Sequence, residues 1–243
     1  EAFGVSVSEE GLTIAGFDDV GLMYGCLAVS EKLESGRELR SFTEAPALRT
    51  RGIYELAHNR DLEKDRFYSK TYWTTYFNML ARNRINSFNY VFSHQTSYMA
   101  PVFAYFLRDE KYPQVRPDDV DEGTVDKNDE MMAFITQLAA DRGIAFILGI
   151  WEIYPWSGGE GDWRPKQVNH VPGLTEDILE DYIYRGTKAM LTRYPAITGI
   201  QVRVNEESSI PASRQTAFFK NTIFKAVSET GRLMDYRGWL ALP

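Results

Sequence analysis

Two acidic residues, Glu206 and Glu207, follow an apolar alternating segment and are the strongest candidates for chemistry in this sequence. Valine alternates with polar residues near the end of 197–204, the period of two that is typical of a β-strand whose two faces differ. Carboxylates just past the carboxyl end of such a strand lie where a (β/α) barrel collects its functional side chains. The sequence therefore predicts a site that contains Asn205, Glu206 and Glu207.

Glycoside hydrolysis is a chemistry that suits this pattern. It needs a carboxylic acid that stays protonated near neutral pH to meet the leaving oxygen, and usually a second carboxylate as base or nucleophile. Glu206 is our candidate for the acid, and a solvated glutamate after a strand is the alternative interpretation. For Glu207 a surface or supporting position is favoured.

Polar or aromatic residues also follow the other strands that the sequence predicts. Sugar rings stack on aromatic side chains, while their hydroxyls need polar partners, so these strand ends together predict a carbohydrate cleft. For each aromatic residue a place in the core, or as a loop anchor, is an equal alternative. The residues concerned are Tyr54, Glu55, His58 and Asn59 after the first strand, His94 and Gln95 after the second, and Trp151, Glu152, Tyr154, Trp156 and Trp163 after the third.

From Leu48 onward, predicted strands alternate with predicted helices, which indicates a parallel sheet in an α/β fold. About five βα steps are present where a closed barrel has eight, so we expect the N-terminal part of a (β/α)8 TIM barrel over 46–243. The remainder of the barrel, or a second chain, would complete it. The expected strands are 51–57, 86–92, 144–150, 197–204 and 233–240, the expected helices are 69–82, 128–140, 175–194 and 218–230, and an irregular insertion fills 93–127.

Residues 1–45 predict a small α/β domain that precedes the barrel. Its expected elements are strands over 3–7 and 12–15 and a helix over 20–33, which Asp18 or Asp19 can cap. A unit of this size is too small to fold alone, so we expect it to pack on the barrel.

The composition limits the classes of partner that we expect for this protein. With 44% hydrophobic residues in 243, the chain can bury a sizeable core. A net charge of -7 and unclustered Lys and Arg argue against nucleic acid, and no apolar run approaches the roughly 20 residues of a membrane helix. Cys26 is expected to be a buried thiol, and the scattered histidines predict neither a structural metal nor a cofactor.

The chain begins at Glu1 without Met, as a mature product or an excerpt of a longer polypeptide would. Localisation is therefore open, with secretion and the periplasm among the options.

Several short segments carry a resemblance as a set. They are the run 21–25 that ends in Tyr24-Gly25, Pro46 before Arg51-Gly52-Ile53, 83–86, 140–144 and Tyr194-Pro195. Together they resemble the β-N-acetylhexosaminidases and their relatives, the α-glucuronidases. The resemblance covers nearly the whole chain, as the second domain and the first half of the barrel in that superfamily. It implies that Arg51 binds a sugar hydroxyl and that Glu206, after the fourth strand, is the general acid.

Asn205 departs from the hexosaminidase pattern, which has an aspartate there to polarise the acetamido group of the substrate. Substrate-assisted cleavage of N-acetyl sugars is therefore in doubt. An Asn-Glu pair after a fourth strand also resembles the large clan of retaining glycosidases. In that clan the Asn holds a sugar hydroxyl, the Glu is the acid/base and the nucleophile is on the seventh strand. Either resemblance implies that the second catalytic group lies beyond Pro243.

The sequence thus predicts a glycoside hydrolase, or a fragment of one, that acts on a polysaccharide or glycan and is inactive as this chain alone. A non-catalytic carbohydrate-binding or assembly module is the alternative from another class. A barrel enzyme with other chemistry, such as an isomerase or lyase, would need a metal cluster or a Schiff-base lysine at a strand end.

Overall fold

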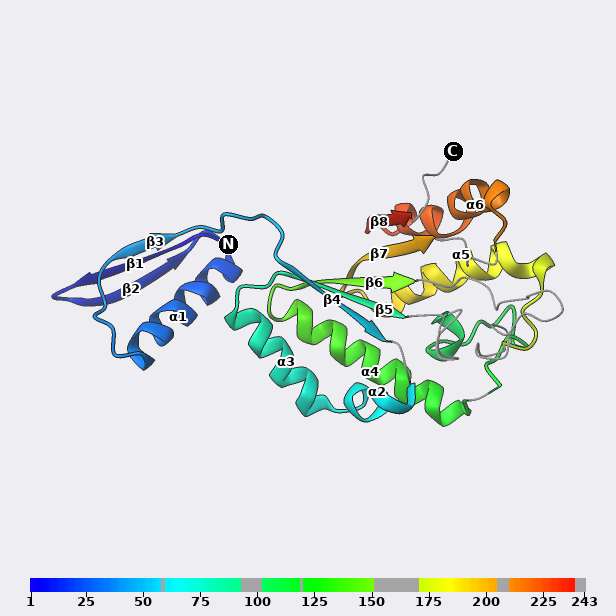
Figure 1. The fold of residues 1–243 in the computed structure, drawn as a ribbon, viewed down its shortest axis with the longest axis horizontal. Helices are drawn as coiled ribbons and strands as arrows, with labels where there is room; N and C mark the ends of the chain where they lie inside the picture. Colours follow the sequence, from blue (N-terminus) through cyan, green and yellow to red (C-terminus); the bar gives the residue numbers. More distant parts are fainter. Residues whose placement is uncertain (58–59, 93–101, 119, 151–170, 205–209, 239–243) are drawn as a thin grey trace.

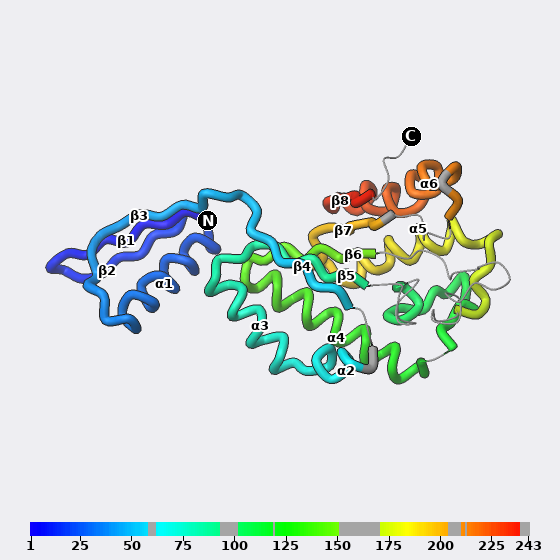
Figure 2. The backbone as a smooth tube through the Cα atoms, viewed as in Figure 1, coloured from blue at the N-terminus to red at the C-terminus, as the bar shows by residue number. Residues whose placement is uncertain are grey.

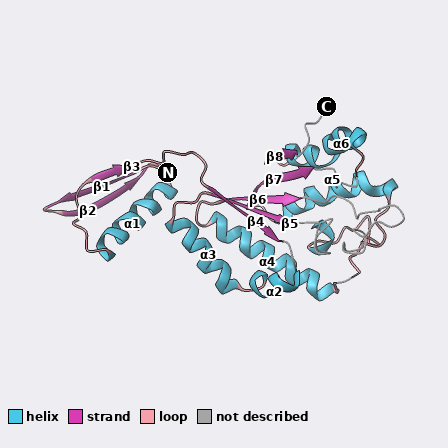
Figure 3. Ribbon diagram, viewed as in Figure 1, coloured by secondary structure: helices cyan, strands magenta, loops and turns pink. Residues whose placement is uncertain are grey.

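Two β-sheets organise the molecule (Figure 1). The structure is a computed structural model that describes residues 1–57, 60–92, 102–118, 120–150, 171–204 and 210–238. The first sheet has three strands in the order β2-β1-β3, and the second has five in the order β4-β5-β6-β7-β8. Figure 3 shows helices beside both sheets, so the fold is of mixed α/β type, as predicted.

The small sheet is antiparallel and one helix packs on it. Its strands are β1 (Phe3–Ser8), β2 (Gly11–Gly16) and β3 (Phe42–Glu44), and the helix is α1 (Asp19–Glu34). The Asp18 carboxylate accepts a hydrogen bond of 2.7 Å from the Gly21 N–H, which caps α1. β3 was not predicted from the sequence, because three residues are too few to show a period.

Cys26 corrects one expectation. It lies on α1 but is exposed, because the face of the helix that packs on the small sheet is formed by Tyr24, Ala28 and Val29 instead.

The five-stranded sheet is parallel throughout, and its strands lie side by side in chain order. Among the described residues, each edge strand, β4 and β8, pairs on one side only. The described strands therefore form part of a barrel wall, in which the first and last strands do not pair with each other. The strands are β4 (Gly52–Ala57), β5 (Ser87–Phe92), β6 (Ala145–Ile150), β7 (Ile197–Val204) and β8 (Leu233–Gly238).

Helices connect these strands and cover the outside of the sheet, with α3 and α4 along one flank and α6 along the other (Figure 1). No helix in the described ranges is long and apolar enough to cross a membrane. The connecting helices are α2 (Arg60–Phe67), α3 (Lys70–Arg82), α4 (Glu122–Ala140), α5 (Glu176–Arg193), α6 (Ala212–Phe219) and α7 (Lys225–Glu229), with a 3-10 turn at Val102–Tyr105 and a π-helical turn at Lys220–Phe224.

The main core lies between the helices and the outer face of the five-stranded sheet. Trp73 of α3 is fully buried against Phe88 and Tyr90 of β5, and its indole N–H donates to the Phe67 carbonyl at 2.9 Å. Every second residue of β5, β6 and β7 contributes to this core, which fixes the face that these strands turn to the helices: Phe88, Tyr90, Phe92, Phe146, Leu148, Ile150, Ile200 and Val202.

Two helix starts and one whole helix differ from the prediction. α4 begins at Glu122 rather than at Asn128, because the Asp121 carboxylate accepts a 2.7 Å hydrogen bond from the Thr124 N–H and so caps an earlier turn. The last helical stretch begins at Ala212, where 218 was expected. α2 was missed, since its sequence is mostly charged and carries almost no apolar period.

The three-stranded sheet and α1 adjoin the amino ends of the parallel strands. Figure 2 follows the chain from the small sheet directly into β4. The Glu1 carboxylate accepts hydrogen bonds from Arg51 and, at 2.9 Å, from the Asn86 side chain, while Val20 of α1 packs against Gly143. The predicted packing of residues 1–45 on the barrel unit thus involves both charge and close contact.

Candidate active site

The inner face of the five-stranded sheet, which we define as the face opposite the helices, carries polar side chains. On β7, Val202 faces the helices, so Gln201 and Arg203 project from the opposite face. Both are buried, at 8% and 6% exposure. Barrel interiors are usually filled by branched apolar residues, so a polar inner face indicates a functional surface or a specific polar core.

Arg203 joins the two sides of this inner face. Its guanidinium donates to the Tyr54 hydroxyl of β4 at 2.9 Å and to the Gln201 amide oxygen at 2.8 Å. The guanidinium carbon also lies 4.3 Å from the centre of the Tyr54 ring. Strands β4 and β7 are three strand spacings apart, about 14 Å on a flat sheet. We infer that the sheet curls as a barrel wall does.

Gln201 continues the connection to β8, because its amide nitrogen donates to the Asp235 carboxylate. Sequence reasoning identified the polar face of β7 but did not include Gln201 or Arg203 in the site. The alternation with valine was the signal that could have done so. Burial lowers the pKa of the Arg203 guanidinium, and the nearby Tyr54 hydroxyl offsets part of this effect.

The carboxyl ends of all five strands meet at one edge of the sheet, because the strands are parallel. The described strands end there at Ala57, Phe92, Ile150, Val204 and Gly238. Most predicted site residues follow these ends closely in the chain, but they lie outside the described residues: His94, Trp151, Glu152, Trp156, Asn205, Glu206 and Glu207, together with His58, Asn59, Gln95, Tyr154 and Trp163.

Of the three predicted site residues that are described, only Tyr54 lies on the inner face. It stands in the middle of β4, is half exposed and contacts Arg203. Its predicted contact with a substrate stays a prediction.

Glu55 requires a correction, because it projects toward the helices. Its carboxylate forms an ion pair of 2.7 Å with Arg66 of α2 and lies near Tyr76 of α3. Burial raises the pKa of Glu55, although the Arg66 charge opposes the shift, and burial beside this carboxylate raises the pKa of Tyr76 to about 12. The alternation along β4 turns Glu55 away from any ligand on the inner face.

Arg51 requires a second correction. It precedes β4 and therefore lies at the amino edge of the sheet, away from the edge where the strands end. Its guanidinium donates to the carboxylate of Glu1 and to the carbonyls of Leu48 and Arg84. Burial would lower the pKa of Arg51, but the Glu1 carboxylate and the Tyr24 hydroxyl outweigh it and hold that pKa above its usual value. Arg51 thus joins β4 to the segment before β1, at the edge of the sheet opposite to the one where the strands end.

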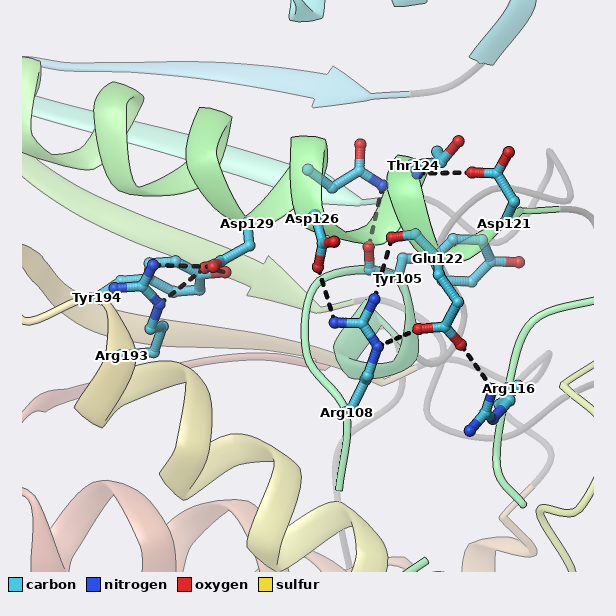
Figure 4. Close-up of polar contacts among 11 residues, drawn as sticks. Tyr105, Arg108, Arg116, Asp121, Glu122, Thr124, Asp126, Asp129, Arg193 and Tyr194 are labelled. Atoms are coloured by element: carbon cyan, nitrogen blue, oxygen red, sulfur yellow. Dashed lines mark hydrogen bonds and ion pairs between the residues drawn. The ribbon is translucent and has the colours of Figure 1, made fainter. Parts of the chain in front are cut away.

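Residues 102–118 of the predicted insertion form an ordered annex beyond the carboxyl ends of the strands (Figure 1). Its first residues, 102–106, are buried in the main core. Figure 4 shows Arg108 between Asp126 and Glu122 at the start of α4, with Arg116 on the other side of Glu122.

A second set of ion pairs fixes the annex to α5. Arg185 donates two hydrogen bonds of 2.8 Å to Asp109, and Lys111 pairs with Asp181 at 2.8 Å. Burial would raise the pKa of Asp109, but the bonds from Arg185 and from the Lys111 N–H outweigh it and hold that pKa below its usual value. The annex is thus bound to two helices.

Within the ranges that the structure describes, no group of three or more His, Cys, Asp or Glu is placed to hold a metal ion.

Comparison with known proteins gives solved structures only. No family model matches the chain, and no curated protein does. A GH138 enzyme described as targeting pectin rhamnogalacturonan II is similar with a TM-score of 0.71 and 22% identity, over 94% of this chain and 28% of that one. A GH20 β-N-acetylglucosaminidase has a TM-score of 0.60 and 15% identity, over 97% of this chain and 53% of that one.

The GH20 β-N-acetylhexosaminidase of Streptomyces coelicolor A3(2) is similar at a TM-score of 0.61 and 14% identity, over 98% of this chain and 51% of that one. The chain therefore spans between 28% and 53% of the length of these three proteins. Identities this low establish the fold and leave the activity open. The chain is thus similar in fold to these glycoside hydrolases over nearly its whole length, which includes both of its sheets.

Proposed function

We propose that this chain is part of a glycoside hydrolase that acts on a polysaccharide or glycan. One observation carries the proposal: the polar face of β7 ends at the carboxyl edge of a barrel-type sheet, and Asn205 and Glu206 directly follow Val204 in the sequence. The likeness in fold to glycoside hydrolases of the GH20 and GH138 types supports the proposal. In such folds the site is built at this edge.

Glu206 is the proposed general acid, which protonates the leaving oxygen of the glycosidic bond. The other proposed residues bind substrate, by hydrogen bonds to hydroxyls or by stacking on the sugar face. Those residues are Tyr54, His94, Trp151, Glu152, Trp156, Asn205 and Glu207.

The second carboxylate of the mechanism is proposed to come from the part of the barrel that would lie between β8 and β4. Both of these strands have an unpaired edge within the described residues. Further βα units, from a longer polypeptide or a second chain, would pair with these edges and bring the carboxylate to the same mouth. This chain alone is therefore expected to be inactive.

The test uses the complete enzyme with Glu206→Gln, assayed on glycosides that differ in leaving group. Loss of the acid should lower kcat/KM by about 10²- to 10⁴-fold on substrates with basic leaving groups. The loss should be far smaller for a nitrophenolate, which leaves without a proton. Glu180→Gln, on the exposed side of α5, is the matched control and should keep parental rates.

Equal losses on both leaving groups, or no loss on either, would remove Glu206 from the role of acid. If the unmodified complete protein bound glycans but cleaved none of them, a non-catalytic carbohydrate-binding module would be the better description.

A further inference from the structure

A cavity of about 190 Å³ lies where the small sheet and α1 meet the amino edge of the five-stranded sheet. Its walls come from β1, α1, the segment between β3 and β4, and the turn that follows α3. The lining residues 44–46 are exposed, so the cavity opens to solvent on that side. Its volume equals the share of about six water molecules in the liquid. The cavity is therefore large enough for a small molecule.

The Tyr24 hydroxyl in the cavity wall is buried without a hydrogen bond. Its side chain is 3% exposed, and within the described part of the chain its oxygen has no hydrogen-bond partner. Arg51 interacts with it electrostatically but donates its hydrogen bonds to Glu1 and to the carbonyls of Leu48 and Arg84. Burial raises the pKa of Tyr24, so the hydroxyl is neutral at neutral pH. A buried hydroxyl of this kind usually meets a ligand or water, so Tyr24 indicates an occupant.

Arg84 lines the same cavity in a strained conformation. Its φ is 60°, in the left-handed region that residues other than glycine seldom adopt. In this conformation its carbonyl accepts from Nε of Arg51 at 2.5 Å, and its guanidinium carbon lies 5.4 Å from the centre of the Tyr24 ring. Strained residues of this kind cluster at sites that bind ligands. The strain is thus a second observation that points to a binding site.

The charges around the cavity are balanced. Arg51 forms an ion pair with Glu1, and Arg84 donates to the two carboxylate oxygens of Glu31 at 3.1 and 3.2 Å. Glu44 adds a further carboxylate at the exposed rim. An anionic ligand would have to displace a carboxylate from its arginine and would be repelled by Glu44. The charges therefore favour a neutral ligand.

We propose that this cavity binds a neutral polyhydroxylated ring of the size of one monosaccharide, at a place separate from the proposed catalytic site. Hydroxyls of the ligand would pair with Tyr24 and Glu44, while its C–H face would lie against Phe3 and Pro46, which supply apolar wall. Pockets for drug-sized ligands begin at about 300 Å³, so this smaller cavity suits a single ring. The proposal does not require Glu206 to be an acid.

The experiment measures hydrogen–deuterium exchange of the complete protein with D-glucose, D-galactose or L-rhamnose, and with acetate as the anionic comparison. At about 100 mM, at least one sugar should slow amide exchange in the peptides that cover 44–51 and 83–86, because binding favours the closed state of the segments that line the cavity. Acetate should leave both peptides unchanged. The protection should saturate as the sugar concentration rises.

Tyr24→Phe removes only the hydroxyl and tests its role directly. The free variant should resist urea as well as the parent or better, since the hydroxyl that it loses has no partner in the described chain. The dissociation constant for the sugar should rise about tenfold with the loss of its hydrogen bond. Tyr184→Phe is the matched control, because it removes a hydroxyl bonded to Glu229 on an exposed helix face and should leave sugar binding unchanged.

Glu44→Gln is a second variant, at an exposed position where folding is not at risk. It replaces a charged acceptor by a neutral one and should weaken sugar binding by about threefold. Protection of 44–51 that Tyr24→Phe loses and Tyr184→Phe keeps would support the proposal. It would be overturned if no sugar slowed exchange there, if Tyr24→Phe bound as tightly as the parent, or if acetate alone bound.

The same measurement separates this proposal from the proposed function. Sugar binding at 44–51 by a complete protein that cleaves no glycoside would keep the cavity site and reject the glycosidase. Glycosidase activity without any protection of 44–51 would keep the glycosidase and reject the cavity site.

Discussion

Arg51, directly before β4, and Arg203, on β7, lie near opposite ends of the strands of one parallel sheet. Arg51, at the amino edge, donates to a carboxylate and two carbonyls of neighbouring segments, and its pKa is raised. Arg203, near the carboxyl edge, donates to neutral Gln201 and Tyr54, and burial lowers its pKa. The two edges therefore use the same side chain differently.

At the amino edge, side-chain contacts join the N-terminal residues and α1 to the five-stranded sheet. There the small domain contributes the Glu1 carboxylate and Val20, and the sheet side contributes Arg51, Asn86 and Gly143. The carboxyl edge has the polar inner face and the annex, whose charges pair with α4 and α5. Substitutions at the amino edge should thus alter the unfolding free energy, and substitutions on the inner face should alter the rate of the proposed glycoside hydrolysis.

Arg51→Met should give the largest loss of stability. It leaves the half-buried Glu1 carboxylate without its cation and two carbonyls without their donor, which should cost about 3 kcal/mol of unfolding free energy. Urea unfolding, followed by circular dichroism, measures the change. Arg49→Met, at an exposed position two residues earlier, should change stability by less than about 0.5 kcal/mol. If both variants lowered the unfolding free energy equally, Arg51 would not make a specific stabilising contact with Glu1.

Gly143→Ala should have the next largest effect and tests the close contact at the same joint. Gly143 has a φ of 64°, and a Cβ there would lie 2.3 Å from a Val20 methyl group. Strain in the left-handed region and this overlap should together cost about 2 kcal/mol.

Two further variants divide that cost. Gly36 has a φ of 65°, and a Cβ added there would have nothing within 4 Å. Gly36→Ala should therefore show only the cost of backbone strain, about 1 kcal/mol of unfolding free energy. Val20→Ala should make Gly143→Ala less costly, by removing the overlap. If Gly143→Ala cost no more than Gly36→Ala, Val20 would not be packed against Gly143.

Asp109→Asn should have the smallest effect and tests the annex. The ion pair with Arg185 is partly exposed, so its loss should cost about 1 kcal/mol at pH 7. The pKa of Asp109 is lower in the folded chain than its ordinary value of 3.8, so the ionised form is the stabilised one. The difference between parent and variant should therefore be complete above about pH 5 and should shrink as the pH falls below 3.8.

Asp118→Asn, at an exposed position in the same annex, is the matched control and should show no such pH dependence. A parent–variant difference for Asp109→Asn that stayed constant from pH 7 to pH 3 would show that the carboxylate charge does not hold the annex.

Much of the fold could be predicted from the pattern of residues, and the misses have physical causes. The strands 86–92 and 144–150 were found within one residue because alternating or continuous apolar residues face a packed core. α2 and β3 were missed because one is nearly all charged and the other is very short. The start of α4 was set by a cap at Asp121, a local hydrogen bond that apolar periodicity does not report.

The candidate site was less predictable. Tyr54 was predicted at the end of its strand but lies within β4 on the inner face, whereas Glu55, its neighbour in the chain, faces Arg66 and the helices. Alternation along β4 already required these two residues to point in opposite directions. Arg51 was assigned to the site by resemblance, although a residue that precedes a strand lies at the amino edge of a parallel sheet.

By itself the sequence determined which segments form the five-stranded sheet, which of their residues alternate and that these five strands are parallel, because these properties follow from local periodicity and from the helices between the strands. Only the tertiary structure decided that Arg203 meets Tyr54, 149 residues apart in the chain, and that Arg51 meets Glu1. Such contacts depend on how the sheet curls and how two domains pack. Those arrangements arise from the sum of many distant contacts, which no short stretch of sequence records.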